Sequence, residues 1–191
     1  MRIRTLVLFA AFLLPLPMMA DTTYYYTGTD FLSTSGVYTT SDSINGWFSV
    51  GSPLPANLND LGNLYNITTQ VTAFSFSDGV QTISNGNASD SKFEVITDAH
   101  GDISAWIVGA DIVSGGVKIG IIESGSPATG GAGPGEDAAD YLDNSNQAWT
   151  PISGTWSTTP PSAVPEPSSS ILFLTGVTGL AGVVRRKFSR A

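Results

Sequence analysis

The sequence predicts an all-β domain over residues 21–157, either an antiparallel β-sandwich or a β-barrel-like fold. Three observations predict it: apolar and polar residues alternate over short stretches, Thr, Ser, Asn and aromatic residues are abundant, and turn-forming residues separate the stretches. Because alternate side chains of a strand share a face, each stretch has one face for a core and one for solvent. We expect a signal peptide before this domain and a transmembrane helix after it.

The first half of the domain contains four predicted strands. The second of them is expected to carry a β-bulge at Gly46, and Asp78-Gly79 is a strong hairpin signal before the fourth. Residues 29–36 are predicted to be a connector or a short strand, and residues 51–63 a loop or a single helical turn because of their prolines. The predicted strands are residues 22–27, 43–50, 66–77 and 80–83.

The second half continues the alternation and then becomes rich in glycine. After a polar loop over residues 84–90, three strands are predicted, and a Gly-rich loop over residues 124–137 follows them. Residues 138–142 are predicted to be a short strand or a helical turn, and residues 149–156 to close the domain. The three strands are residues 91–97, 103–110 and 117–123.

The N-terminal residues 1–20 have the organisation of a secretory signal peptide. Arg2 and Arg4 precede an apolar run over residues 6–14, and a proline-containing segment then leads to Ala20. A basic start, an apolar run of this length and a helix-breaking end are typical of a signal that is removed, which predicts Sec-type export and cleavage after Ala20.

Three different pieces make up the C-terminal end. Residues 158–167 form a Pro-rich linker in which Pro165 and Pro167 hold Glu166 in extended backbone, the conformation that a protease cleft binds. Residues 168–184 carry no charge, and as a helix they would extend about 25 Å, close to the thickness of a thin bilayer. Residues 185–191 form a basic tail, predicted to stay on the cytoplasmic side as a stop signal. Its stop-signal residues are Arg185, Arg186 and Lys187.

This order of a Pro-Glu-Pro motif, an apolar run and a basic tail resembles the PEP-CTERM sorting signal of exported bacterial proteins. The resemblance implies that an exosortase in the membrane recognises and processes the chain at or near Pro165, Glu166 and Pro167. The strand and turn residues of the middle region also look like a domain common among PEP-CTERM proteins, for which the resemblance implies no catalytic activity. The residues concerned are 24–28, 36–48, 74–79 and 93–98.

Charge and cysteine content limit the classes of function. Between residues 21 and 163 there are 15 acidic residues against Lys92 and Lys118, an excess of 13 negative charges. Such a domain repels phosphate groups, which excludes nucleic-acid binding. The chain has no cysteine, so the exported domain contains no disulfide and depends on its core for stability.

Few residues are suited to catalysis. His100 is the only histidine and lies in a predicted turn, which favours an exposed, solvated side chain over a general base. Glycoside hydrolysis needs two carboxylates about 5 to 9 Å apart, and the sequence alone does not set that separation. We expect no catalysis. The acids considered for such a pair are Glu94, Glu123, Asp98, Asp102 and Asp111.

Binding of carbohydrate or calcium requires less of the sequence. Exposed aromatic faces on a sheet suit sugar rings. Trp47, Trp106 and Trp149 are the candidate glycan contacts, and Trp156 is a fourth candidate. Burial in the core is the alternative for each of them. Two oxygen-rich loops are candidate Ca²⁺ ligands, although ordinary polar turns explain them equally well and no cofactor is otherwise expected. These loops comprise residues 85–90 and the set Glu136, Asp137, Asp140, Asp143 and Asn144.

The expected function is that of an exported, exosortase-processed surface or extracellular-matrix protein associated with exopolysaccharide and biofilm. The terminal helix would anchor it in the membrane before processing. The alternative is a secreted carbohydrate-binding or carbohydrate-active β domain that carries the same signal, and a third hypothesis is simple C-terminal anchoring in the membrane without processing.

Overall fold

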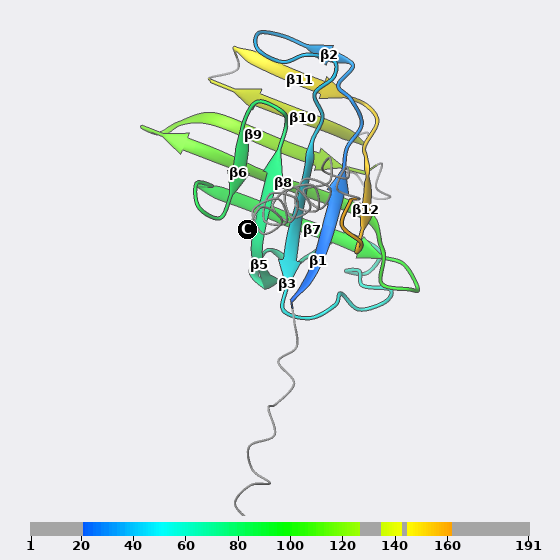
Figure 1. The fold of residues 1–191 in the computed structure, drawn as a ribbon. Helices are drawn as coiled ribbons and strands as arrows, with labels where there is room; N and C mark the ends of the chain where they lie inside the picture. The colour runs from blue at the N-terminus through cyan, green and yellow to red at the C-terminus, as the bar shows by residue number, and fades with distance from the viewer. Residues whose placement is uncertain (1–20, 127–134, 143–144, 162–191) are drawn as a thin grey trace, which may run out of the picture. The chain divides into compact units, whose positions relative to one another are not determined.

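The computed structural model describes residues 21–126, 135–142 and 145–161, and all the elements below lie in the first of two compact units, which ends at Thr159. The described residues form strands in two antiparallel sheets and one short 3₁₀ helix, η2 (Thr68–Gln70). The two sheets face each other as layers (Figure 1). The all-β prediction is therefore confirmed, and the arrangement is a sandwich rather than a barrel.

Sheet A has five strands in the order β12-β1-β3-β5-β6. Figure 1 is viewed onto this sheet, and its strands cross those of the second sheet behind it. The strands are β1 (Thr22–Thr27), β3 (Asn45–Val50), β5 (Val71–Ser77), β6 (Thr82–Ser84) and β12 (Thr155–Ser157).

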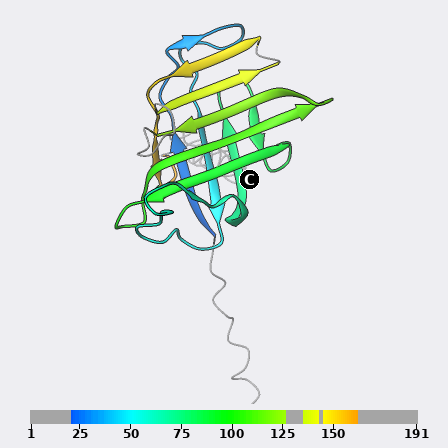
Figure 2. The ribbon, with the colours of Figure 1, turned by 180° about the vertical axis from the view of Figure 1, so that it is seen from behind.

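Sheet B has seven strands in the order β2-β11-β10-β9-β8-β7-β4, and Figure 2 is viewed onto its outer face. Its longest strands, β7, β8 and β9, run next to one another as a meander joined by tight turns. The strands are β2 (Ser33–Thr34), β4 (Tyr65–Asn66), β7 (Asp90–Thr97), β8 (Ile103–Ser114), β9 (Val117–Gly125), β10 (Glu136–Tyr141) and β11 (Asn146–Thr150).

Aromatic side chains fill the space between the sheets. Phe93 of sheet B lies 5.4 Å from Phe48 and 5.2 Å from Phe74 of sheet A, measured between ring centroids, and both pairs meet edge to face. Each fully buried ring of this size stabilises the fold by roughly 1.5 to 3 kcal/mol through removal of apolar surface from water. The alternation seen in the sequence thus produces one shared aromatic core.

A buried hydrogen bond joins β1 of sheet A to β10 of sheet B. The Tyr26 hydroxyl of β1 donates to Asp137 Oδ1 of β10 over 2.6 Å, and both residues are fully buried. The backbone N–H of Gly154 donates in turn to the Tyr26 hydroxyl. Burial raises the pKa of the Asp137 carboxyl to about 6, because the hydrogen bond from Tyr26 lowers it by less than desolvation raises it.

A second buried hydrogen bond joins Tyr38 to Asp78, the first residue of the β5–β6 turn. The Tyr38 hydroxyl donates to Asp78 Oδ2 over 2.7 Å, and the Gln81 amide nitrogen donates both to the same oxygen and to the backbone carbonyl of Asp140 in β10. Gly79 has φ +93°, as the hairpin signal Asp78-Gly79 requires. The predicted hairpin is confirmed, and its turn is tied to sheet B.

The predicted bulge at Gly46 is wrong. Gly46 pairs in regular register with Tyr26 and Phe76, and the register shift lies between Ser49 and Val50. A side chain at Gly46 would meet the Phe76 ring and the Ser75 carbonyl, so glycine is needed here for close packing.

Two other sequence predictions are corrected. The single strand expected over residues 66–77 is divided by η2, so that β4 belongs to sheet B and β5 to sheet A. The closing segment 149–156 is likewise two strands in different sheets, β11 and β12. For residues 138–142, where a short strand or a helical turn was expected, the structure shows a strand, β10. Local alternation does not reveal which sheet a strand joins, because that depends on distant partners.

Stability should fall as pH rises through the range in which Asp137 ionises. The folded pKa of about 6 lies above the ordinary 3.8, so the folded state holds the proton more tightly. The resulting contribution is fully present below about pH 4 and lost above about pH 6, and it amounts to roughly 3 kcal/mol. We expect Asp137→Asn to remove this component, so that the free energy of unfolding falls less between pH 4 and pH 7 in the variant than in the wild type. Urea unfolding of both proteins at the two pH values measures this. Equal pH slopes for the two proteins would contradict the assignment.

Candidate functional site

One row of side chains crosses the outer face of sheet B. The register pairs Lys92 of β7 with Gly109 of β8, Gly109 with Glu123 of β9, Glu123 with Ala138 of β10, and Ala138 with Trp149 of β11. We call these five residues the Trp149 row. Long side chains alternate in it with the small residues glycine and alanine.

Trp149 forms one end of the row and is the exposed tryptophan of the described residues, with 40 % of its surface accessible. Its indole N–H donates to Glu136 Oε2 over 2.8 Å, which holds the ring in one orientation. Its neighbour across the strands, Ala138, carries only a methyl group. The structure therefore presents an oriented aromatic face beside open space, the geometry that stacks on the apolar face of a planar ligand or sugar ring.

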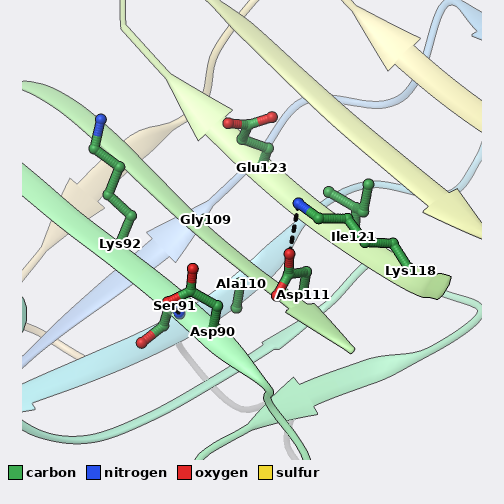
Figure 3. Close-up of a pocket in the computed structure, with 9 residues that line it drawn as sticks. All are labelled: Asp90, Ser91, Lys92, Gly109, Ala110, Asp111, Lys118, Ile121 and Glu123. Carbon is green, nitrogen blue, oxygen red and sulfur yellow. Dashed lines mark hydrogen bonds and ion pairs between the residues drawn. The ribbon is translucent and has the colours of Figure 1, made fainter. Parts of the chain in front are cut away.

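A shallow depression of about 170 Å³ lies at the other end of the row (Figure 3). Gly109 forms part of its floor, with Lys92 and Glu123 on either side. A Cβ atom at Gly109 would lie 3.3 Å from Glu123 Cγ, so a larger residue would fill the depression. The remaining lining residues are Asp90, Ser91, Ala110, Asp111, Lys118 and Ile121.

The charges at this depression are largely paired. Asp90 and Asp111 are directly opposite each other on β7 and β8, an arrangement that is unfavourable for like charges. Lys118 Nζ lies 2.6 Å from Asp111 Oδ2 and compensates it. The hydrogen bond that Lys118 donates to Asp111 raises the pKa of Lys118, so the ammonium stays protonated. Lys92 and Lys118, the two cations between residues 21 and 163, both line this depression.

The other tryptophans occupy different places. Trp106 is only 6 % exposed, and its indole N–H donates to the Ser124 hydroxyl inside the sandwich. Trp156 packs against Tyr26 with ring centroids 5.0 Å apart. Trp47 is partly exposed on the outer face of sheet A. Trp106 is thus a core residue with no ring face for a sugar, whereas Trp47 and Trp149 lie on opposite outer faces.

Of the five acids considered for catalysis, only Asp111 and Glu123 line the same depression. Glu94 pairs with Lys92 over 3.0 Å and does not line the depression that contains Glu123. The two glutamates lie on β7 and β9, and two strand spacings separate their backbones by about 10 Å across the sheet. Asp111 is compensated by Lys118. No pair of these five acids shares the depression except Asp111 and Glu123.

His100 lies in the turn between β7 and β8, and its side chain is 82 % exposed. Asp98 Oδ1 accepts the backbone N–H groups of His100 and Asp102, and these hydrogen bonds, that of His100 first, lower the pKa of Asp98. The three residues therefore form an ordinary polar turn, as the sequence favoured for His100.

The candidate calcium loops use their oxygens internally. Asn85 Oδ1 accepts the backbone N–H of Phe74, and Asn87 Oδ1 accepts that of Ser84. Glu136 points outward to Trp149 while Asp137 points into the core, so these two do not share a site. Among the described residues no group of three or more His, Cys, Asp or Glu side chains is placed to hold a metal ion. Asp143 and Asn144 lie outside the described residues.

The residues of the two predicted terminal signals also lie outside the part that the structure describes. These are Ala20, residues 165–167, residues 168–184 and residues 185–187. The described residues contain no helix with the length and apolar character needed to span a membrane.

The fold and the chain's C-terminal end define a β-sandwich protein that carries a sorting signal. A family model described as the PEP-CTERM protein-sorting motif matches residues 163–187. The chain thus carries a PEP-CTERM sorting motif, and the matched region fits a terminal transmembrane segment. Such a signal implies export, anchoring at the membrane and processing by an exosortase, followed by a surface or extracellular location.

Neither the curated proteins nor the solved structures include a match to the chain. The family match lies outside the β domain, so the resemblance of that domain to one common among PEP-CTERM proteins stays a prediction.

Sequence reasoning identified Trp149 but missed its neighbours in the site. Gly109, Lys118 and Ala138 carry no motif, and only the register of β8, β9 and β10 brings them together. The one available signal was that both lysines of the domain lie in predicted strands, Lys92 in residues 91–97 and Lys118 in residues 117–123.

Proposed function

We propose that this protein is a non-enzymatic component of an extracellular matrix, exported by Sec-type machinery and associated with exopolysaccharide in a biofilm. The observation that carries the proposal is the sorting motif at residues 163–187, directly after an acidic β domain. Processing at or near Pro165-Glu166-Pro167 would separate the domain from its membrane segment. The acidic surface keeps the domain soluble and away from anionic membranes after release.

The arrangement of charged groups supports a role without catalysis. A hydrolytic site needs an acid and a base or nucleophile set across a cleft that holds the substrate. At the depression on sheet B, Asp111 forms an ion pair with Lys118. Glu94, which does not line the depression, forms an ion pair with Lys92. These groups suit contacts with hydroxyls better than proton transfer.

Processing predicts a defined mature C-terminus. In cells with an exosortase, mass spectrometry should find a chain that ends close to Pro167 and lacks residues 185–191, because the signal is removed with its basic tail. Glu166→Ala should strongly reduce this product, and Glu94→Ala serves as a control outside the signal. Persistence of Arg185-Arg186-Lys187 on the mature wild-type protein, or unchanged processing of Glu166→Ala, would favour simple membrane anchoring instead.

A second candidate function is carbohydrate binding through the Trp149 row. The oriented and exposed ring of Trp149 favours it, together with the depression at Gly109 and the hydrogen-bonding side chains of Lys92 and Glu123. Sugar ligands combine an apolar ring face with hydroxyl groups, and the row offers a partner for each.

This candidate predicts that Trp149→Ala weakens binding to polysaccharide about two- to tenfold, since a stacked ring contributes roughly 0.5 to 1.4 kcal/mol. Gly109→Val should also weaken binding by filling the depression. Affinity electrophoresis through gels that contain soluble glucan, xyloglucan or galactomannan measures both. Tyr65→Ala removes an exposed aromatic residue at the sheet edge and should have no effect. Wild-type affinity in the Trp149→Ala variant would exclude the row as the binding site.

A further inference from the structure

The outer face of sheet A carries a second aromatic pair. Tyr25 of β1 and Trp47 of β3 are directly opposite in the register, on the side of the sheet that faces away from the core. Both are partly exposed. Directly opposite residues have Cβ atoms about 5 Å apart, so the two side chains are neighbours on this face. We call these two residues the Tyr25–Trp47 patch.

The polar atoms of this patch face outward without a protein partner. Within the described residues, neither the Tyr25 hydroxyl nor the Trp47 indole N–H is in a hydrogen bond, and neither is a buried unpaired atom. Three other polar aromatic groups behave differently, because the Tyr26 and Tyr38 hydroxyls and the Trp149 N–H donate to carboxylates. The Tyr25–Trp47 patch therefore combines apolar ring surface with donors that remain available to a ligand.

The surroundings of the patch are uncharged and rich in hydroxyl groups. The row that contains it continues to Ser157 on one side and to Ser75 and Ser84 on the other. The two flanking rows likewise contain no charged residue. They consist of Thr23, Ser49 and Ala73, and of Thr155, Thr27, Asn45, Ser77 and Thr82.

This absence of charge from the three rows decides the chemistry of the occupant. The domain has an excess of 13 negative charges between residues 21 and 163, yet none of its acids lies in these rows. An anionic polymer would be repelled by the domain as a whole, and a cationic one would gain nothing at this patch. A neutral polysaccharide matches it, with apolar ring faces for Tyr25 and Trp47 and hydroxyls for the Ser and Thr side chains.

We propose that the domain binds neutral polysaccharide on the Tyr25–Trp47 patch as well as on the Trp149 row, and thereby cross-links two polysaccharide chains. The inference rests on the proposed function and specifies its ligand class and mode of action. The two sites lie on opposite outer faces of the sandwich, because Trp47 belongs to sheet A and Trp149 to sheet B (Figures 1 and 2). Two packed sheets, whose backbones are about 10 Å apart, separate them, so each site takes its own chain segment.

The test separates binding from cross-linking in the mature protein recovered from exosortase-containing cells. Affinity electrophoresis measures binding to soluble glucan, xyloglucan and galactomannan, with alginate as the anionic comparison. Light scattering of the same mixtures measures cross-linking, and sedimentation of the protein alone establishes that it is monomeric. The variants are Trp47→Ala, Tyr25→Ala, Trp149→Ala, the double variant Trp47→Ala/Trp149→Ala, and Tyr65→Ala as the matched control. Circular dichroism checks that each variant is folded, and Trp47→Phe tests rescue by a conservative ring.

We expect the wild type to bind a neutral polysaccharide and to raise its scattering severalfold. Trp47→Ala, Tyr25→Ala and Trp149→Ala should each bind within about tenfold of wild type but leave the scattering at the level of the polymer alone, while the double variant should not bind. Full scattering by folded Trp47→Ala and Tyr25→Ala, or loss of all binding in one single variant, would overturn the inference. Binding by the wild type without increased scattering would overturn the inference and leave the proposed function standing. No binding to any polysaccharide would overturn both.

Discussion

The buried hydrogen bond from Tyr26 to Asp137 holds the two sheets of the sandwich in position. A carboxyl group between two sheets is costly unless it is hydrogen-bonded, and this one is bonded from the opposite sheet. The local backbone is adapted to it: Gly28 has no side chain where a Cβ would lie 2.7 Å from Asp137 Oδ2, and the Gly154 N–H donates to the Tyr26 hydroxyl. One interaction thereby fixes β1, β10 and the segment before β12 relative to one another.

This bond and the aromatic core together allow an exported domain to be stable without a disulfide. The chain has no cysteine, and its inner faces are occupied by rings such as Phe48, Phe74 and Phe93. The interior is filled by these rings, so the proposed binding residues lie on the two outer faces. Sheet B presents Trp149 among paired charges, and sheet A presents Tyr25 and Trp47 among uncharged hydroxyl residues. The difference between the faces follows from the alternation of side chains along each strand.

The sequence predicted those features that depend on neighbouring residues. Alternation predicted most of the strands, and Asp78-Gly79 predicted a hairpin whose glycine has the expected positive φ. The C-terminal order of proline, apolar and basic residues predicted the sorting motif that the family match bears out. Each of these signals is local, which is why it could be recognised from sequence.

Features that depend on distant residues could not be predicted. The pairing of Tyr26 with Asp137 joins residues 111 positions apart, and the Asp137 side chain had been considered only as a calcium ligand. Trp106 and Trp149 are the same residue type in similar strands, yet one is in the core and the other is exposed because of the face on which each lies. Gly46 was predicted to mark a bulge, but glycine is needed there because a side chain would collide with the Phe76 ring of the adjacent strand.

A double-mutant cycle on Tyr26→Phe and Asp137→Ala at pH 7 tests most directly whether this cross-sheet bond holds the sandwich together. Urea unfolding of the wild type, the two single variants and the double variant gives the coupling free energy between the two side chains. The bond to an ionised carboxylate predicts a coupling of about 1.5 to 3 kcal/mol. A coupling below about 0.5 kcal/mol, with both single variants as stable as the wild type, would contradict the account.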